Sequence, residues 1–348
     1  MNAGAARLTG AEALDLLERG DLLDLGYRAD ELRRRHHPGD EVTFIVDRNI
    51  NYTNVCVSGC RFCAFYRDAG SPDAYVLSED EIHAKIEETL ALGGTAVMMQ
   101  GGLHPDLRID WFERLFSGIK QRYAIHIHSL SPPEVAHIAE RSGLGVTETL
   151  RRLHAAGLDS LPGGGAEVLV DRVRSAISPH KISTDAWLDV MRQAHALGLK
   201  TTATMMFGSL DAPQDRVEHL RRIRDLQDET GGFTAFIPWT FQAGNTRLQA
   251  GHVPSTGIDY LRMLAVSRLY LDNVPNIQAS WVTQGIKLGQ VSLAFGANDM
   301  GSTMIEENVV RAAGVSHKVS VEQMVGAIRA AGRTPVQRDT LYRPLRRY

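Results

Sequence analysis

Apolar and polar positions alternate along this chain with two periods, and these periods predict strands and helices in regular succession. Residues 42–54, VTFIVDRNINYTN, are rich in β-branched side chains and predict a strand. Residues 78–94, SEDEIHAKIEETLALGG, begin with a serine and an acidic turn, carry apolar residues at helical spacing, and end at a glycine pair. They predict a helix, and TAVMMQGG at 95–102 predicts the next strand.

The same alternation continues to the end of the chain. Further strands are predicted within AIHIHSLS, LPGGG, TTATMMFG, FTAFIPWTF, NIQASWV and finally VSLAFGAND (residues 291–299), with helical patterns between them. Counting from residue 44, about eight strand-then-helix units favour an α/β chain folded as a single (β/α)8 TIM-type barrel. A doubly wound open sheet stays an alternative, because strand order cannot be deduced from periodicity.

The barrel is predicted to span residues 42–332. Residues 1–41 form an N-terminal helical extension and linker, and residues 333–348 form a basic C-terminal tail that caps the barrel or stays mobile. In barrels of this type the active site lies where strands end and loops begin. These strand ends are dense in Gly, Pro, His, Asn, Gln and acidic residues, so one end of the barrel is expected to carry the chemistry.

Composition narrows the classes of partner. The chain has 348 residues, 43% of them hydrophobic and 23% charged, as expected of a folded chain with a buried core, and its formal net charge is −3. This balance gives no basic surface for nucleic acid or an anionic membrane and favours a small-molecule partner. No apolar run approaches the ~18 residues that cross a bilayer, and the N-terminus does not resemble a signal peptide, so a cytoplasmic location is expected.

All three cysteines lie within CVSGCRFCAF, directly after the first predicted barrel strand. Cys56, Cys60 and Cys63 follow the spacing C-x3-C-x2-C. An odd number of cysteines cannot form a closed disulfide framework, whereas three thiolates in one short loop can bind a single soft metal centre. A structural zinc site, which prefers four ligands, and unrelated buried thiols are the alternatives.

An iron–sulfur cluster with four irons usually takes four thiolates. With three in the whole chain, one iron is left for a ligand other than cysteine. S-adenosylmethionine fits that position, because its amino and carboxylate groups can chelate iron.

At this point the sequence resembles a known family. C-x3-C-x2-C with an aromatic residue before the third cysteine, in the loop after the first barrel strand, is similar to the radical S-adenosylmethionine enzymes. The resemblance implies that Cys56, Cys60 and Cys63 hold a 4Fe–4S cluster and that Phe62 shields it. It also implies that S-adenosylmethionine is cleaved to methionine and a 5′-deoxyadenosyl radical, which abstracts hydrogen from substrate, and that Gln100, Gly101 and Gly102 meet its amino group.

Other segments narrow the resemblance to one branch of the family. RNINYTNVCVSGCRFCAFYR, LPGGGAE, TTATMMFG and LQDETGGFTAFIPWTFQ are similar to the radical enzymes of the futalosine route to menaquinone and to deazaflavin synthases. TMMFG, IPWTFQ and the Tyr66-Arg67 pair most resemble cyclic dehypoxanthine futalosine synthases. This implies that dehypoxanthine futalosine is the substrate, that its ribose radical closes on the benzoate ring, and that an external one-electron donor and acceptor take part. Aminofutalosine synthase and deazaflavin synthase are the alternatives, and a non-enzymatic metal-binding protein is a more distant one.

The remaining candidates come from the strand ends. Glu167 is a candidate catalytic and cofactor-binding residue, placed to bind ribose hydroxyls or the amino group of S-adenosylmethionine, with a helix N-terminal acid as the structural alternative. His128 is a candidate base and Ser129 a candidate cofactor contact, although strand alternation puts His126 and His128 on one face, so either can be a packed interior histidine. Candidate substrate-binding residues are Arg67, Thr240, Gln242 and Asn245, which could equally serve as a surface arginine and loop caps.

One position departs from the family pattern. Where relatives are expected to have His and Glu after the fifth strand, as FGHxE, this chain has Ser209 and Asp211. Asp211 keeps a carboxylate and is a catalytic candidate, whereas Ser209 lacks an imidazole. The departure implies that another group replaces the histidine or that the substrate differs. The base, the redox partners and the oligomeric state cannot be deduced from the sequence.

Overall fold

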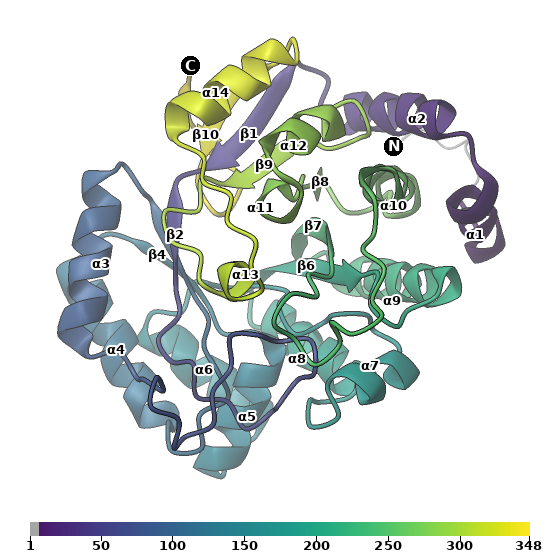
Figure 1. Cartoon of the computed structure of the whole chain (residues 1–348). Helices are drawn as coiled ribbons and strands as arrows, with labels where there is room; N and C mark the ends of the chain where they lie inside the picture. Colours follow the sequence, from purple (N-terminus) through teal and green to yellow (C-terminus); the bar gives the residue numbers. More distant parts are fainter. Residues whose placement is uncertain (1–6) are drawn as a thin grey trace.

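A computed structural model describes residues 7–348, and in it parallel strands surrounded by helices form the centre of the molecule (Figure 1). Residues 1–6 of the predicted N-terminal extension lie outside the described residues. Seven parallel strands neighbour one another in chain order: β2 (Asp47–Ile50), β3 (Ala96–Met99), β4 (His126–Ser129), β5 (Ser160–Leu161), β6 (Lys200–Phe207), β7 (Phe233–Thr240) and β8 (Asn276–Ile277).

An eighth strand, β9 (Asp299–Ser302), closes the ring. On one side it joins β8 through a parallel bridge between Gln278 and Asp299. On the other side it pairs in parallel with β1 (Glu41–Ile45), which leads directly into β2. Beyond the strand, the Thr303 amide donates to the Ile45 carbonyl at 2.9 Å. The predicted TIM-type barrel is therefore confirmed, and the open doubly wound sheet is excluded because the first and last strands meet.

The helices cover the outside of this barrel because each buries one apolar stripe. Helix α3 (Glu79–Ala91) shows how the sequence builds them: Ser78 and Glu81 form a capping box, and Ile82 and Ile86 are buried. The other outer helices are α4 (Ile109–Arg122), α5 (Pro132–Ser142), α6 (Val146–Ala156), α7 (Asp171–Ile177), α8 (Thr184–Ala196), α9 (Pro213–Thr230) and α10 (Gly257–Tyr270). Two N-terminal helices, α1 (Gly10–Arg19) and α2 (Leu22–His36), pack against α9 and α10.

Two predicted strands differ from the structure. The stretch 42–54 forms β1 and β2, while Asn51–Asn54 already belong to the loop before the cysteines. The apolar run at 291–299 is not a strand: residues 286–292 form α12 (Ile286–Ser292), and β9 begins only at Asp299. A short apolar run fits a buried helix as well as a strand, and here Leu293 and Phe295 reach the core from a turn.

The C-terminal residues extend the sheet rather than the ring of helices. After α14 (Val321–Ala330), β10 (Thr334–Arg338) pairs in parallel with β1, and β11 (Pro344–Arg347) pairs antiparallel with β10. The Arg338 guanidinium donates to both oxygens of Asp299 at 2.5 and 2.9 Å, in a buried ion pair at the start of β9. Within residues 7–348 no helix is both long enough and apolar enough to span a bilayer.

Candidate active site

The cysteine loop leaves β2 and is fastened to its surroundings by backbone hydrogen bonds. The Cys56 amide donates to the Arg67 carbonyl at 3.0 Å, and the Arg67 amide donates to the Asn54 carbonyl at 2.8 Å. The Arg61 amide donates to the carbonyl of Ile177, the last residue of α7, at 2.8 Å. The loop is therefore a defined structure that presents its thiols from one strand end of the barrel.

The three thiols lie in a setting that suits a bound cation. Cys60 is buried, Cys56 and Cys63 are half-buried, and the Cys63 amide donates to the Cys60 carbonyl at 3.2 Å. Burial raises the pKa of Cys63 to about 11 and also raises the pKa of Cys60. A positive metal centre would favour the thiolates that burial alone disfavours. Within residues 7–348, no three His, Cys, Asp or Glu side chains already converge as a metal site, so the fit rests on these soft donors sharing one loop.

A buried ion pair lies beside the cysteine loop. Lys181 contacts the carboxylate of Glu167, and its ammonium group lies 5.0 Å from the centre of the Phe62 ring. The Lys181 charge opposes the burial effect on the pKa of Cys60. Glu167 itself has a φ of 45°, in the left-handed region that non-glycine residues rarely adopt. Through Lys181, Glu167 lies beside the cysteine loop, and its predicted contact with the cofactor or a ribose stays a prediction.

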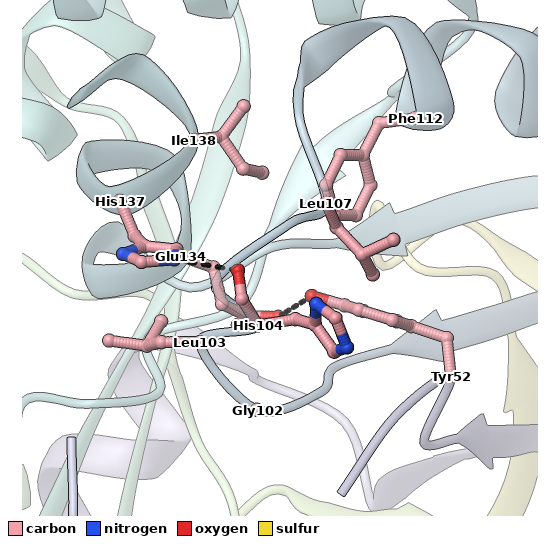
Figure 2. Close-up of a pocket in the computed structure, with 9 residues that line it drawn as sticks. All are labelled: Tyr52, Gly102, Leu103, His104, Leu107, Phe112, Glu134, His137 and Ile138. Atoms are coloured by element: carbon pink, nitrogen blue, oxygen red, sulfur yellow. Dashed lines mark hydrogen bonds between the residues drawn. The ribbon is translucent and has the colours of Figure 1, made fainter. Parts of the chain in front are cut away.

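The glycine pair after β3 is held by a buried carboxylate that the sequence analysis missed. Glu134, at the start of α5, accepts hydrogen bonds from the Gly101 amide at 3.0 Å and from the Tyr52 hydroxyl at 2.7 Å. Figure 2 shows this group at the wall of a small pocket that Gly102 also lines. Burial raises the pKa of Glu134. The carboxylate thereby fixes the amide of Gly101 and the orientation of the turn.

Gly102 packs directly against the cysteine loop. Its amide donates to the Thr53 carbonyl at 3.0 Å. A Cβ at this position would lie 2.8 Å from the Cβ of Cys56 and 2.6 Å from the carbonyl carbon of Val55. Only glycine fits this contact, so the predicted glycine turn and the predicted cluster loop form one unit. Gln100, which precedes the pair, accepts a hydrogen bond from the Asn51 side chain at 3.0 Å through its carbonyl.

The candidates on β4 form a packed polar group inside the barrel. His126 and His128 face the same side, as predicted, and a ring nitrogen of each lies 2.7 Å from the Ser160 hydroxyl oxygen. Burial lowers the pKa of His128 to about 3, so its imidazole is neutral and weakly basic. The Ser129 hydroxyl donates to the Met99 carbonyl at 2.7 Å. These contacts support structural roles, and the catalytic role of His128 and the cofactor role of Ser129 stay predictions.

Asp211 stabilises the turn in which relatives were expected to carry histidine. Its carboxylate accepts from the amides of Gly208 and Ser209 at 3.1 and 2.8 Å, from the Ser209 hydroxyl, and from Arg216 Nε at 2.7 Å. The Asp211 side chain is fully buried in this ion pair. Ser209 therefore supplies a turn contact in place of an imidazole, and a catalytic role for Asp211 stays a prediction.

Two further candidates lie at the barrel end near β7, and a third lies in the loop that follows it. The Thr240 hydroxyl accepts from the side-chain amides of Gln242 at 2.9 Å and Gln284 at 2.5 Å. Gln284 ends the short helix α11 (Trp281–Gln284), so this group joins the ends of β7 and β8. Asn245, with a φ of 58°, donates to the carbonyl of Ala312 at 2.9 Å and so stabilises its loop.

Arg67 holds the cysteine loop together. Its Nη1 donates to the carbonyls of Ala64, Phe65 and Tyr66, and its Nε donates to Asp73 at 2.5 Å. Because most of its donors are used within the loop, a stabilising role is the better supported one, and substrate binding stays a prediction.

Sequence reasoning missed three charged residues near the cysteine loop and the glycine turn. Glu134 occurs in SPPE, which indicates a capping box and not an internal brace. Lys181 follows α7 in an unremarkable loop. Arg174 is buried and donates to the carbonyls of Gly165 and Ala166 at 3.1 and 2.5 Å, so it holds the glycine-rich turn before Glu167. No local pattern distinguishes such residues, because their contacts with partners 8 to 82 residues away follow neither the helix nor the strand period.

The sequence profile of the Radical SAM superfamily matches residues 50–223, and that of the CofH/MqnC C-terminal region matches residues 230–347. The chain belongs to the radical S-adenosylmethionine superfamily. It is therefore an enzyme of this superfamily, whose cofactors are a 4Fe–4S cluster and S-adenosylmethionine.

Curated relatives of this radical S-adenosylmethionine enzyme carry two different names. The chain is 48% identical to the cyclic dehypoxanthine futalosine synthase of Streptomyces coelicolor, over 99% of this chain and 87% of the relative. It is also 48% identical to that of Halalkalibacterium halodurans, over 98% of this chain and 92% of the relative. It is 45% identical to the 5-amino-6-(D-ribitylamino)uracil–L-tyrosine 4-hydroxyphenyl transferase of Methanococcoides burtonii, over 97% and 96% of the two chains.

Solved structures agree on the fold of this radical S-adenosylmethionine enzyme. Methylornithine synthase superposes with a TM-score of 0.75 at 19% identity, covering 95% of each chain. The FeFe-hydrogenase maturase HydG from Carboxydothermus hydrogenoformans gives a TM-score of 0.78 at 15% identity, covering 97% of this chain and 78% of the other.

Proposed function

We propose that this enzyme converts dehypoxanthine futalosine to cyclic dehypoxanthine futalosine, with Cys56, Cys60 and Cys63 as the cluster ligands. The observation that supports this choice of substrate is the 48% identity, over nearly the whole chain, to two relatives named cyclic dehypoxanthine futalosine synthase. The buried thiol loop packed against the glycine turn supports the ligand assignment.

When bound, the cluster and S-adenosylmethionine supply a carbon radical that removes one hydrogen atom from the substrate. Gly101 and Gly102, whose turn Glu134 fixes through the Gly101 amide, would offer backbone carbonyls to the amino group of S-adenosylmethionine. Glu167, paired with Lys181, would offer an acidic contact to the same cofactor, and Phe62, beside Lys181, would shield the cluster. These residues would hold and orient S-adenosylmethionine beside the cluster. Such positioning keeps the reacting atoms at short distances and excludes water.

In the proposed reaction the substrate loses one hydrogen atom, one proton and one electron. A ribose C–H bond breaks and leaves a carbon radical. This radical forms a C–C bond to the attached benzoate ring, and the ring then loses one proton and one electron to restore a closed-shell product. An external one-electron acceptor and a proton acceptor are therefore required. The neutral histidine pair on β4 is poorly suited as that base, since burial lowers the pKa of His128 to about 3.

A second function is favoured by a separate observation. The 45% identity to the archaeal transferase also spans nearly the whole chain, so transfer of a 4-hydroxyphenyl group from L-tyrosine is the alternative. The experiment that separates the two functions uses anaerobically reconstituted protein with S-adenosylmethionine and a reductant. We expect 5′-deoxyadenosine and a cyclised product with dehypoxanthine futalosine. Formation of 5′-deoxyadenosine only with 5-amino-6-(D-ribitylamino)uracil and L-tyrosine would overturn the proposal.

A further inference from the structure

A second pocket opens where β9 ends, away from the glycine turn. Its walls are residues 304–308, Arg311 of α13 (Val309–Ala312), residues 315–318, and Val282 of α11. Its volume, including the part open to solvent, is about 500 Å³. We refer to it as the β9 pocket. It lies at the same end of the barrel as the cysteine loop, because both follow strand C-termini.

The β9 pocket is lined by two acids and two cations that do not form ion pairs with one another. Arg311, His317 and Lys318 contribute three nitrogen-bearing side chains. Within residues 7–348 no carboxylate lies within the 4.0 Å ion-pair limit of Arg311 or Lys318. Arg311 Nη2 donates only to the neutral side chain of Asn308, at 3.0 Å. Two cations therefore face the pocket without an acidic partner.

The two acidic residues of the pocket are already occupied by other groups. Glu306 accepts from Lys85 Nζ at 2.7 and 2.9 Å and lies 3.8 Å from Arg48. Glu307 accepts from the backbone amides of Val309, Val310 and Arg311 at 2.8 to 2.9 Å, which caps the start of α13. Glu306 also accepts from the side-chain amide of Asn308, which lines the pocket, at 2.9 Å. Both carboxylates are thus engaged by these donors, and neither forms an ion pair with Arg311 or Lys318. The pocket thus favours an anionic guest.

The remaining wall is apolar. It is formed by Val282, Met304 and Ile305, which are partly buried and pack against the hydrophobic core of the barrel. Met304 has a φ of 51°, in the left-handed region that non-glycine residues rarely adopt. It is held by the Ser302 hydroxyl oxygen, which accepts from the Met304 amide at 2.6 Å. An apolar wall beside the two cations, Arg311 and Lys318, suits a planar group that carries a carboxylate.

Hydrogen bonds connect the β9 pocket to the proposed cofactor site. The Asn308 side chain donates to the Asn51 side chain at 3.3 Å, and Asn51 in turn donates to the Gln100 carbonyl at 3.0 Å. Gln100 precedes the glycine pair. These hydrogen bonds would therefore link a guest in the β9 pocket to the turn that is proposed to meet S-adenosylmethionine.

We infer that the β9 pocket binds the carboxylate of the substrate, with Arg311 and Lys318 as its cationic contacts and Met304 beside its ring. This inference rests on the proposed function, in which that carboxylate is the one on the benzoate ring. L-Tyrosine, the substrate named for the alternative relatives, also carries a carboxylate. The shared chemistry is thus a carboxylate on an aromatic molecule.

The test is a kinetic cycle with two substrates and three variants. The substrates are dehypoxanthine futalosine and its carboxamide, in which the charge is absent, and the variants are Arg311→Gln, Lys318→Gln and the control Lys287→Gln. Lys287 is an exposed cation on α12 that does not line the pocket. With wild-type enzyme we expect the amide to lower kcat/KM about tenfold, mainly through KM, as uniform binding energy is lost.

For Arg311→Gln and Lys318→Gln we expect KM for the acid to rise about tenfold and the preference for acid over amide to fall toward one. Lys287→Gln should keep the wild-type preference. If both pocket variants discriminate acid from amide as strongly as the wild type does, the inference is wrong.

The design separates the inference from the proposed function. If the wild type makes no cyclised product but turns over L-tyrosine with 5-amino-6-(D-ribitylamino)uracil, the function is wrong and the cycle is repeated with L-tyrosine and L-tyrosinamide. Saturation-transfer NMR with benzoate and benzamide requires no turnover. Binding of benzoate over benzamide by the wild type, and its loss in Arg311→Gln, would support the site; equal signals in both proteins would refute it.

Discussion

Replacing Gly102 with alanine tests the contact between the glycine turn and the cysteine loop. The added Cβ would lie 2.6 Å from the Val55 carbonyl carbon and 2.8 Å from the Cys56 Cβ, and closer still to the Val55 carbonyl oxygen. Ordinary carbon contacts are about 3.5–4.0 Å, so the loop backbone must move by about 1 Å. Overpacking of this kind costs up to about 3 kcal/mol, and a 1 Å misplacement lowers rates by about a hundredfold.

We expect Gly102→Ala to lower the free energy of unfolding by about 2–3 kcal/mol in urea titrations. We also expect it to reduce 5′-deoxyadenosine formation about a hundredfold after anaerobic reconstitution, with less iron bound per chain. Gly118→Ala is the matched control, because nothing lies within 4 Å of its Cβ position in α4. That change should raise stability by about 0.5–1 kcal/mol and leave iron content unchanged. Wild-type stability, iron content and cleavage in Gly102→Ala would refute the argument.

Three further outcomes are expected. Cys60→Ala should abolish S-adenosylmethionine cleavage and the brown absorbance of the reconstituted protein, and retained cleavage would show that the cluster is held by other ligands. Arg338→Met should lower the free energy of unfolding by about 3–5 kcal/mol, because it leaves buried Asp299 unpaired, whereas Arg343→Met, at a pair whose arginine is exposed, should cost less than about 1 kcal/mol. Burial raises the pKa of Asp47 to about 6, above the unfolded value of about 3.9, so the folded state binds more protons between these values and stability falls as pH rises through them. Asp47→Asn should therefore be more stable than the wild type at pH 8 by up to about 3 kcal/mol in urea titrations, and a gap that does not narrow toward pH 4 would contradict this assignment.

Much of the candidate site was predictable because its signals are local. The spacing of Cys56, Cys60 and Cys63, the glycine pair after β3 and the acidic residue after LPGGG all occupy fixed positions relative to strand ends. Gly102 and Glu167 do lie next to the cysteine loop in the structure. The brace Glu134 was not predictable, because its partners Tyr52 and Gly101 lie 82 and 33 residues away. Lys181 and Arg174 contact partners 8 to 14 residues away, but that spacing matches no helix or strand period, so no sequence pattern indicates the contacts.

The sequence by itself determined the order of strands and helices, the single thiol loop and the family resemblance, because periodicity and motif spacing are properties of neighbouring residues. It could not determine which run of apolar residues becomes the last strand. Tertiary structure decided that, since residues 291–295 bury their side chains from a helix and a turn while Asp299 pairs with Arg338 to begin β9. Tertiary structure also decided that Asp211 and Arg67 use their charged groups to hydrogen-bond turns of the backbone. The same is not true of the Arg311 and Lys318 side chains, which line the β9 pocket. Whether a charge is free depends on partners brought close by folding, and that information lies in distances between segments rather than along the chain.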